Sequence, residues 1–315
     1  MIRLLLALLL LAFAGSATAA PKPEPKRIAL SFDDVPRQPG AFLTPDQRTQ
    51  GILSGLAAAK VKQAVFFVTT GNLDKPEGKG GLERIMMYET GSHVIANHSH
   101  AHRRLSQIST DEYLQDVDRA AAWLRNRPNS RPWFRFPFLD EGRADKAKRD
   151  AVRAGLAQRG LLNAYVTVDG ADWNMEALTV AARAAGKDMD MTALRELYVE
   201  TMVGAANFYD GLARRTLGRS PAHMLLLHET DLAALFLPAL VEGLRKDGWE
   251  IVTADEAYAD PIARALPDTP SAQGTRLEAM AWQKGLPAPR WYEREDLKIA
   301  NALFAQRVLK ETPAP

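Results

Sequence analysis

Short apolar runs alternate with helix-forming segments along most of this chain, and this alternation constrains its fold more than any other feature. The strand-like runs are rich in β-branched and aromatic residues and occupy residues 27–32, 64–69, 93–96, 133–136, 163–168, 224–227 and 251–253. The helix-like segments between them lie at residues 45–60, 82–89, 109–124 and 146–158. Strands that alternate with helices predict an α/β fold with a parallel sheet or barrel.

Capping signals support two of these helices. Thr44 stands directly before Pro45, an arrangement typical of a helix start. Ser109 stands three residues before Glu112, which is the spacing of a capping box. The segment at 180–217 is also helix-forming, and it is long for a single connection.

The N-terminal residues 1–20 have the pattern of a secretory signal peptide. Arg3 precedes the apolar run Leu4 to Phe13, and Ala17-Thr18-Ala19 offers small residues for cleavage. A retained anchor helix is the alternative, but the run is short for a bilayer. We therefore expect a periplasmic or secreted bacterial protein without a stable membrane anchor after cleavage. The chain has no cysteine, so its stability after export would come from its core.

Composition divides the rest of the chain. We expect a short Pro/Lys linker at 21–26, a catalytic domain at 27–260, and a C-terminal extension at 261–315 with a helix at 295–309. The chain has 40 basic and 38 acidic residues, a formal charge of +2. Because nucleic-acid binding needs a basic surface, this near-balance argues against such a partner.

Six polar residues follow predicted strands, where the sites of parallel α/β folds gather: Asp33, Asp34, His98, Arg135, Asp172 and His228. Their common position predicts that they converge. In the stretch His98-Ser99-His100-Ala101-His102, a helix would place the first and last histidines on one face. A strand would place all three together. Either arrangement suits a metal such as zinc, whereas the alternative is a solvated polar loop.

The other residues have equally plain alternatives. Asp33 and Asp34 could serve as a general base and a metal ligand, or as a turn or helix cap. Arg135 could hold a carboxylate, or lie on the surface. Asp172 with Trp173 could form a carbohydrate-facing rim, or belong to the core. His228 at the end of a buried strand is usually a core histidine with a satisfied hydrogen bond.

Together these residues resemble the motifs of the polysaccharide deacetylase family, also called the NodB-homology or carbohydrate esterase family 4 group. Five stretches occur in the family's order over about residues 26–260: Ser31-Phe32-Asp33-Asp34, His98-Ser99-x-x-His102, Arg135-x-Pro137-Phe138, Asp172-Trp173 and Leu226-x-His228. The resemblance implies a distorted (β/α) barrel, here with a C-terminal helical extension. It also implies a divalent metal and hydrolysis of N-acetyl groups on an amino-sugar polymer.

The resemblance also implies a role for each residue. Asp34, His98 and His102 would hold the metal, which would make the histidine stretch helix-like and leave His100 outside the site. The first expectation for the metal is Zn²⁺, with Co²⁺, Mn²⁺ or Ni²⁺ as alternatives. The remaining roles are shared among seven residues. Asp33 would be the general base and Arg135 its orienting partner, and His228 would be the general acid and Asp172 its holder. The Phe138 N–H would be an oxyanion donor, and Trp173 with Leu226 would form an acetyl pocket.

Three features depart from the family pattern. Val35 replaces a usual glycine, so the rim beside the base would be reshaped. Phe138 replaces a usual tyrosine, although its expected role uses the backbone. The segment at 180–217 is longer than usual, and we hypothesise that it forms a helical cap or side wall over the substrate groove.

The sequence therefore predicts a metal-dependent deacetylase acting on a carbohydrate such as peptidoglycan, a chitin-like polymer or an exopolysaccharide. Two alternatives stay open at this point. One keeps the metal site but acts on an ester or another small amide. The other is a carbohydrate-binding pseudoenzyme, which would need a base, ligand or acid to be missing. The sequence leaves the oligomeric state undetermined.

Overall fold

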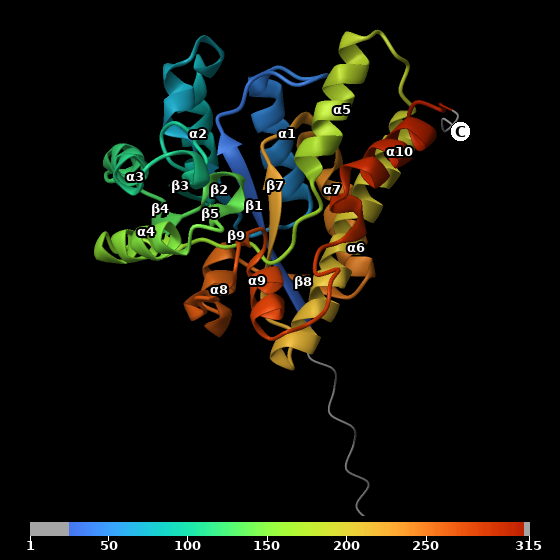
Figure 1. Ribbon diagram of the computed structural model, residues 1–315. Coiled ribbons are helices and arrows are strands. Elements are labelled where there is room, and N and C mark those ends of the chain that lie inside the picture. The colour runs from blue at the N-terminus through green and yellow to red at the C-terminus, as the bar shows by residue number, and fades with distance from the viewer. Residues whose placement is uncertain (1–24, 312–315) are drawn as a thin grey trace, which may run out of the picture.

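The computed structural model describes residues 25–311 (Figure 1), so the predicted signal peptide and most of the linker lie outside the described residues. The strands are β1 (Lys26–Val35), β2 (Val65–Val68), β3 (Val94–Asn97), β4 (Ser130–Phe134), β5 (Asp140–Arg143), β6 (Leu162–Asn163), β7 (Ala222–His228), β8 (Trp249–Ile251) and β9 (Ala272–Gln273). The helices are α1 (Pro45–Ala58), α2 (Gly81–Thr90), α3 (Thr110–Leu124), α4 (Lys146–Gln158), α5 (Asp172–Ala184), α6 (Met191–Leu217), α7 (Asp231–Lys246), α8 (Ala254–Tyr258), α9 (Arg276–Gln283) and α10 (Leu297–Arg307).

One parallel sheet organises the molecule, with the strand order β6-β4-β3-β2-β1-β7 and with β8 paired to β1. The segment after β6 turns back to the opposite edge, where Val168 bridges Leu225 of β7 in parallel. This bridge brings the two edges of the sheet together, so the sheet curls into a distorted barrel. The predicted α/β barrel is confirmed.

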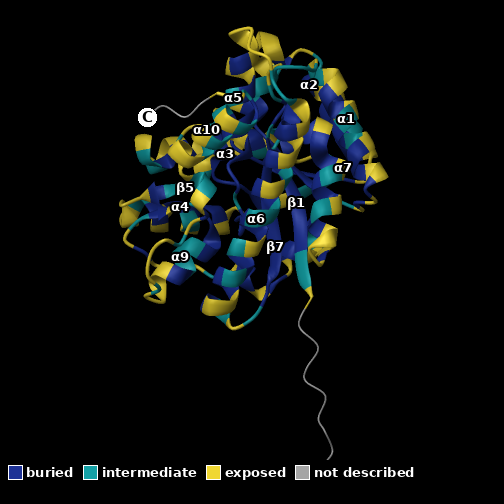
Figure 2. Ribbon diagram, turned by 90° about the vertical axis from the view of Figure 1, so that its right-hand side faces the viewer, coloured by how far each residue is buried: buried dark blue, intermediate teal, exposed yellow. Residues whose placement is uncertain are grey.

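The core lies between this sheet and the helices around it. Ile28, Leu30 and Phe32 of β1 are fully buried, as are Leu225 and Leu227 of β7. A strand with helices on both sides has no solvent-facing side, which explains these continuous apolar runs. In Figure 2 the buried colour fills β1 and β7, and the exposed colour lies on the outer faces of the helices.

Most predicted elements are present. The wrong predictions concern which strands pair with each other and where some elements begin or end. Helix α4 has the predicted bounds, and the predicted caps at Thr44 and Ser109 both form, each as a capping box. The predicted strand at 163–168 is wrong beyond Asn163, because residues 164–168 leave β4 and cross to β7. The stretch at 251–253 is not the last strand, since β9 follows it. Lys26, placed in the linker, begins β1.

The segment at 180–217 forms the end of α5 and the whole of α6, which packs against α7, α9 and α10. All of this segment is described, and none of its residues lines the cavity of the candidate site. The hypothesis of a cap or side wall over the groove is therefore wrong. Within residues 25–311, no helix combines the length and the apolar character needed to cross a lipid bilayer.

Candidate active site

A bulge in β1 turns two adjacent carboxylates toward the same side of the sheet. Successive strand residues normally face opposite ways. The register with β2 shifts between Phe32 and Val35, and Asp34 has a positive φ of 70°. A bulge re-aims a side chain in this way. Asp33 pairs in register with His228 of β7, so the ends of these two strands lie side by side.

The histidine stretch after β3 is a loop, neither helix nor strand, so the helix-like expectation is wrong. Ser99 and His102 have positive φ values of 67° and 52°. The Ser99 Oγ accepts a hydrogen bond from the His102 N–H at 3.0 Å, and Asp116 accepts from the N–H groups of His100 and Ala101. These bonds fold the loop so that its first and last histidines face each other.

Three potential metal ligands meet at this point. Asp34 Oδ1 lies 2.9 Å from His102 Nε2 and 3.4 Å from His98 Nε2, and the two Nε2 atoms are 3.2 Å apart. Within residues 25–311, this is the one group of three or more such side chains close enough to share an ion. The His100 ring turns elsewhere, with Nδ1 3.0 Å from Thr70 Oγ1.

The chemistry of these donors fits a divalent cation. Asp34 Oδ1 is buried and has no hydrogen-bond partner among the described residues, although two imidazole nitrogens lie close to it. The His98 Nδ1 lies 2.9 Å from the Arg135 carbonyl, a partner that leaves Nε2 as the lone-pair atom. Burial raises the pKa of Asp34, but the neighbouring His102 and His98 outweigh it and hold that pKa well below its usual value. Asp34 is therefore an ionised ligand.

A buried ion pair stands on one side of this triad. Arg135 Nη1 lies 3.0 Å from both carboxylate oxygens of Asp33, and both side chains are almost fully buried. The guanidinium also donates to Ser31 Oγ and to the Tyr258 hydroxyl, and it lies over the Phe67 ring. Arg135 therefore has one orientation, which in turn sets that of the Asp33 carboxylate.

A second pair stands at the end of β7. The His228 ring Nδ1 lies 2.7 Å from Asp172 Oδ1, and the backbone N–H of His228 donates to Asp172 Oδ2 at 2.8 Å. Burial lowers the pKa of His228, but the charge of Asp172 and its hydrogen bond raise it to about 9. The imidazole is therefore protonated at neutral pH, and its Nε2–H is free of Asp172.

Residues 20–158 match the sequence profile of the family described as polysaccharide deacetylase. The match covers less than half of the chain, and over these residues the chain is similar to the polysaccharide deacetylase family. The matched stretch contains Asp33, Asp34, His98, His102 and Arg135. The match supports a hydrolase of the deacetylase class. No curated protein sequence matches this chain.

Two solved structures have the same fold as this protein. A polysaccharide deacetylase from Bacillus cereus is 18% identical, with a TM-score of 0.51 over 72% of this chain and 91% of that one. The chitin deacetylase from the fungal pathogen Colletotrichum lindemuthianum is also 18% identical, with a TM-score of 0.50 over 74% of this chain and 88% of that one. At this identity the likeness establishes the fold alone.

The candidate site opens into a cavity of about 370 Å³. Three expected substrate-binding residues line it. Trp173 at the start of α5 is 40% exposed, Leu226 comes from β7, and Phe138 lies beside His102 with 4.6 Å between ring centroids. The side chain of Val35 is fully buried in the core and does not itself line the cavity.

Sequence reasoning missed seven further lining residues: Arg37, Arg104, Leu139, Asp169, Gln273, Gly274 and Glu295. Arg37 and Asp169 each stand within three residues of a recognised motif, so proximity could have found them. The last three belong to the C-terminal extension, which follows no motif. Strand β9 pairs antiparallel with β5, and this pairing carries the extension to the cavity.

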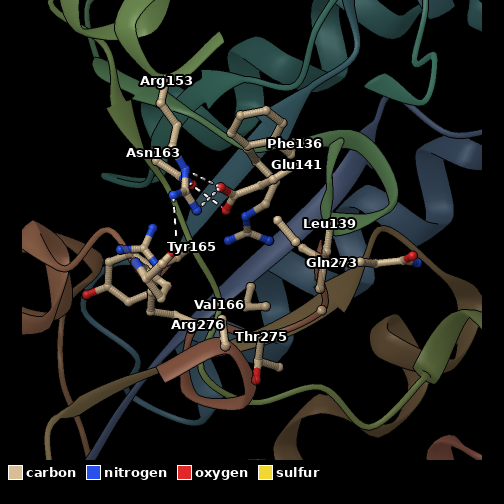
Figure 3. Close-up of a pocket in the computed structure, with 15 residues that line it drawn as sticks. Phe136, Leu139, Glu141, Arg153, Asn163, Tyr165, Val166, Gln273, Thr275 and Arg276 are labelled. Carbon is tan, nitrogen blue, oxygen red and sulfur yellow. Dashed lines mark hydrogen bonds and ion pairs between the residues drawn. The ribbon is translucent and has the colours of Figure 1, made fainter. Parts of the chain in front are cut away.

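Behind Arg135 the extension encloses a smaller cavity of about 20 Å³ (Figure 3), enough for about one water molecule. Arg153 binds Glu141 there at 2.6 Å, and Asn163 donates to the same carboxylate. Arg276 of α9 lies over the Tyr165 ring at 4.6 Å. The extension therefore shares the lining of this cavity with Arg135.

Proposed function

We propose that this protein is a metal-dependent hydrolase that removes N-acetyl groups from an amino-sugar polymer or oligosaccharide. One observation carries the proposal: Asp33, which is paired with Arg135, and His228, which is paired with Asp172, line the same cavity as a metal-ligand triad. Amide hydrolysis needs a base for the attacking water and an acid for the departing amine. The two pairs offer one of each.

Asp34, His98 and His102 would hold the cation. Three protein ligands leave coordination positions open, as catalytic zinc sites require. Zinc is our first expectation, and Co²⁺, Mn²⁺ or Ni²⁺ would suit the same ligands. When bound, the cation would polarise the acetyl carbonyl and acidify water.

Asp33 would accept the proton of the attacking water on a carboxylate oxygen. Arg135 would keep the Asp33 carboxylate turned toward the cavity through its 3.0 Å contacts. This role differs from that of Asp34, whose free Oδ1 faces the two imidazoles. Adjacent aspartates would thus have separate functions because their neighbours differ.

His228 would donate its Nε2 proton to the leaving amine. An amine departs readily only after protonation, and the raised pKa of His228 keeps that proton available at neutral pH. Asp172 would position the ring through Nδ1. The Phe138 N–H would stabilise the oxyanion, and Trp173 with Leu226 would receive the acetyl methyl group.

The proposal extends to the setting of the protein. We propose a catalytic domain at 27–260, a carbohydrate substrate, and a periplasmic or secreted location after removal of residues 1–20. The family match at residues 20–158 and the cavity support the first two of these. Mass spectrometry of the N-terminus after expression in a bacterium would test the third, and retention of Met1 would contradict it.

Acetate release from a panel of N-acetylated glycans tests the activity, with O-acetyl ester analogues measured beside them. We expect faster release from the amides, and a loss of about 10²–10⁴-fold in Asp33→Asn, the range for a general base. Preferential release from the esters would favour the esterase alternative. Glycan binding without release, unchanged in Asp33→Asn, would favour the pseudoenzyme.

A further inference from the structure

Two arginines on the wall of the site cavity carry buried nitrogen atoms that have no partner. Arg37 follows β1, and Arg104 follows the histidine loop. Both line the cavity, and in each the Nη1 is buried with no hydrogen-bond partner among residues 25–311. Buried donors are nearly always paired, so each unpaired one indicates a missing partner.

The backbone of Arg37 is firmly held. Its N–H donates to Glu229 Oε2 at 2.7 Å, and its carbonyl accepts from Arg48 Nη2 at 2.6 Å. Asn72 Nδ2 donates to the carbonyl of the preceding Pro36 at 3.0 Å. The Arg37 guanidinium lies 3.8 Å from Asp34 Oδ2, which belongs to a proposed metal ligand, and the carboxylates of Glu229 and Glu176 are also near this residue. A cation bound to Asp34 would neutralise part of the negative charge of its carboxylate. The positive charge of Arg37 would then be less fully balanced by Asp34.

Arg104 is held by stacking. Its guanidinium carbon lies 3.8 Å from the centroid of the Phe138 ring, and the same ring contacts His102. A stacked guanidinium keeps the N–H groups at its edge available for a planar anion. Arg104 therefore presents donors close to a proposed metal ligand.

The acids of the cavity do not cancel these charges. Asp33 is paired with Arg135, and Asp34 belongs to the triad. Burial raises the pKa of Asp169 to about 6, and burial with the nearby acids raises that of Glu295 to about 10. Glu295 is therefore neutral at pH 7, whereas Asp169 is largely ionised, so the two guanidinium groups of Arg37 and Arg104 outnumber the one remaining carboxylate on the cavity wall.

We propose that Arg37 and Arg104 bind an anionic substituent of the substrate, so that the protein acts on acetylated amino sugars that carry a carboxylate or phosphate near the acetamido group. A guanidinium makes charge-assisted, often bidentate, hydrogen bonds to both anions. The class of substrate in this inference rests on the proposed function. The anion subsite itself can be tested by binding alone, without turnover.

Equilibrium binding tests the subsite without turnover. Calorimetry on zinc-loaded Asp33→Asn would compare an N-acetylated oligosaccharide bearing a carboxylate with the same sugar converted to the primary amide, and with a phosphate-bearing analogue. We expect an anionic ligand to bind about 10- to 100-fold more tightly, the range for hydrogen bonds to charged groups. The tighter of the two anions identifies the substituent.

Arg104→Gln and Arg37→Gln should each reduce this preference several-fold, whereas Arg103→Gln, at an exposed neighbour outside the cavity, should keep it. Circular dichroism confirms that each variant is folded. Equal affinity for the charged and neutral sugars would overturn the inference, even if wild-type protein released acetate from both. Preferential binding of the anion without any acetate release would contradict the proposed function and leave the subsite standing.

Discussion

At the scale of single residues, the separation of His98 from His100 decides which histidines bind metal. The two lie two positions apart, yet His98 Nε2 points at Asp34 while His100 bonds Thr70. We expect His98→Gln to weaken zinc binding by more than about 100-fold, since even outer-shell changes cost 10- to 100-fold. His100→Gln should leave zinc affinity nearly unchanged.

Competition with a chromogenic chelator would measure both affinities on folded protein. Equal losses in the two variants would contradict the assignment of the ligands. A loss in His100→Gln alone would move the metal site toward Thr70.

The His228–Asp172 pair makes a prediction about pH. Only the protonated imidazole can act as the acid, so activity should fall as the pH rises through about 9, the raised pKa of His228. Asp172→Asn removes the negative charge that raises the pKa of His228. That pKa should therefore fall, and the alkaline limb of the activity profile should move about one to three units to lower pH. Profiles of kcat/KM against pH would measure this shift.

Asp188→Asn, at an exposed position, serves as the control for the pH experiment and should keep the wild-type limb. If Asp172→Asn lowered the rate at every pH without moving the limb, Asp172 would not tune His228.

At the scale of secondary-structure elements, one buried ion pair fixes the loop that follows β1. Arg48 of α1 lies 3.4 Å from Asp231 at the start of α7. Asp231 Oδ2 also accepts from the N–H groups of Phe42 and Leu43 at 2.7 and 2.9 Å. This network links the strand that carries Asp33 to the helix that follows His228.

Arg48→Met would leave the Asp231 charge buried and uncompensated. We expect the free energy of unfolding to fall by about 3–5 kcal/mol, as measured by urea denaturation. Lys246→Met removes the exposed Lys246–Glu242 pair of α7 and should change it by about 0.5 kcal/mol or less. Similar small changes in both variants would show that the buried pair contributes little.

Local signals predicted some elements well because the interactions that form them are also local. The predicted cap at Thr44 and the predicted capping box at Ser109 each join residues three positions apart, and both form. The crossing of residues 164–168 to β7 depends on a partner about sixty positions away, so the sequence of that segment could not reveal it. The left-handed conformations of Ser99 and His102 arise from bonds within a folded loop, and the spacing of the histidines could not show them.

At the scale of the whole molecule, the candidate site is assembled from both ends of the described chain. The matched family region at 20–158 carries the triad and the base, whereas α5 and β7 carry Asp172 and His228. The extension contributes Gln273, Gly274 and Glu295 to the cavity wall. Motif spacing identified the first two groups, and only the fold revealed the third. The extension would therefore influence substrate choice more than the chemistry common to the family.

Removal and restoration of the metal test the central claim most directly. The purified protein would be stripped with a chelator and supplied with an N-acetylated oligosaccharide, and acetate release would be measured before and after stoichiometric Zn²⁺. We expect release to stop on stripping and to return with Zn²⁺ in the wild type but not in His98→Gln. Undiminished release from the stripped protein, or restored release in His98→Gln equal to that of the wild type, would contradict a metal centre built from Asp34, His98 and His102.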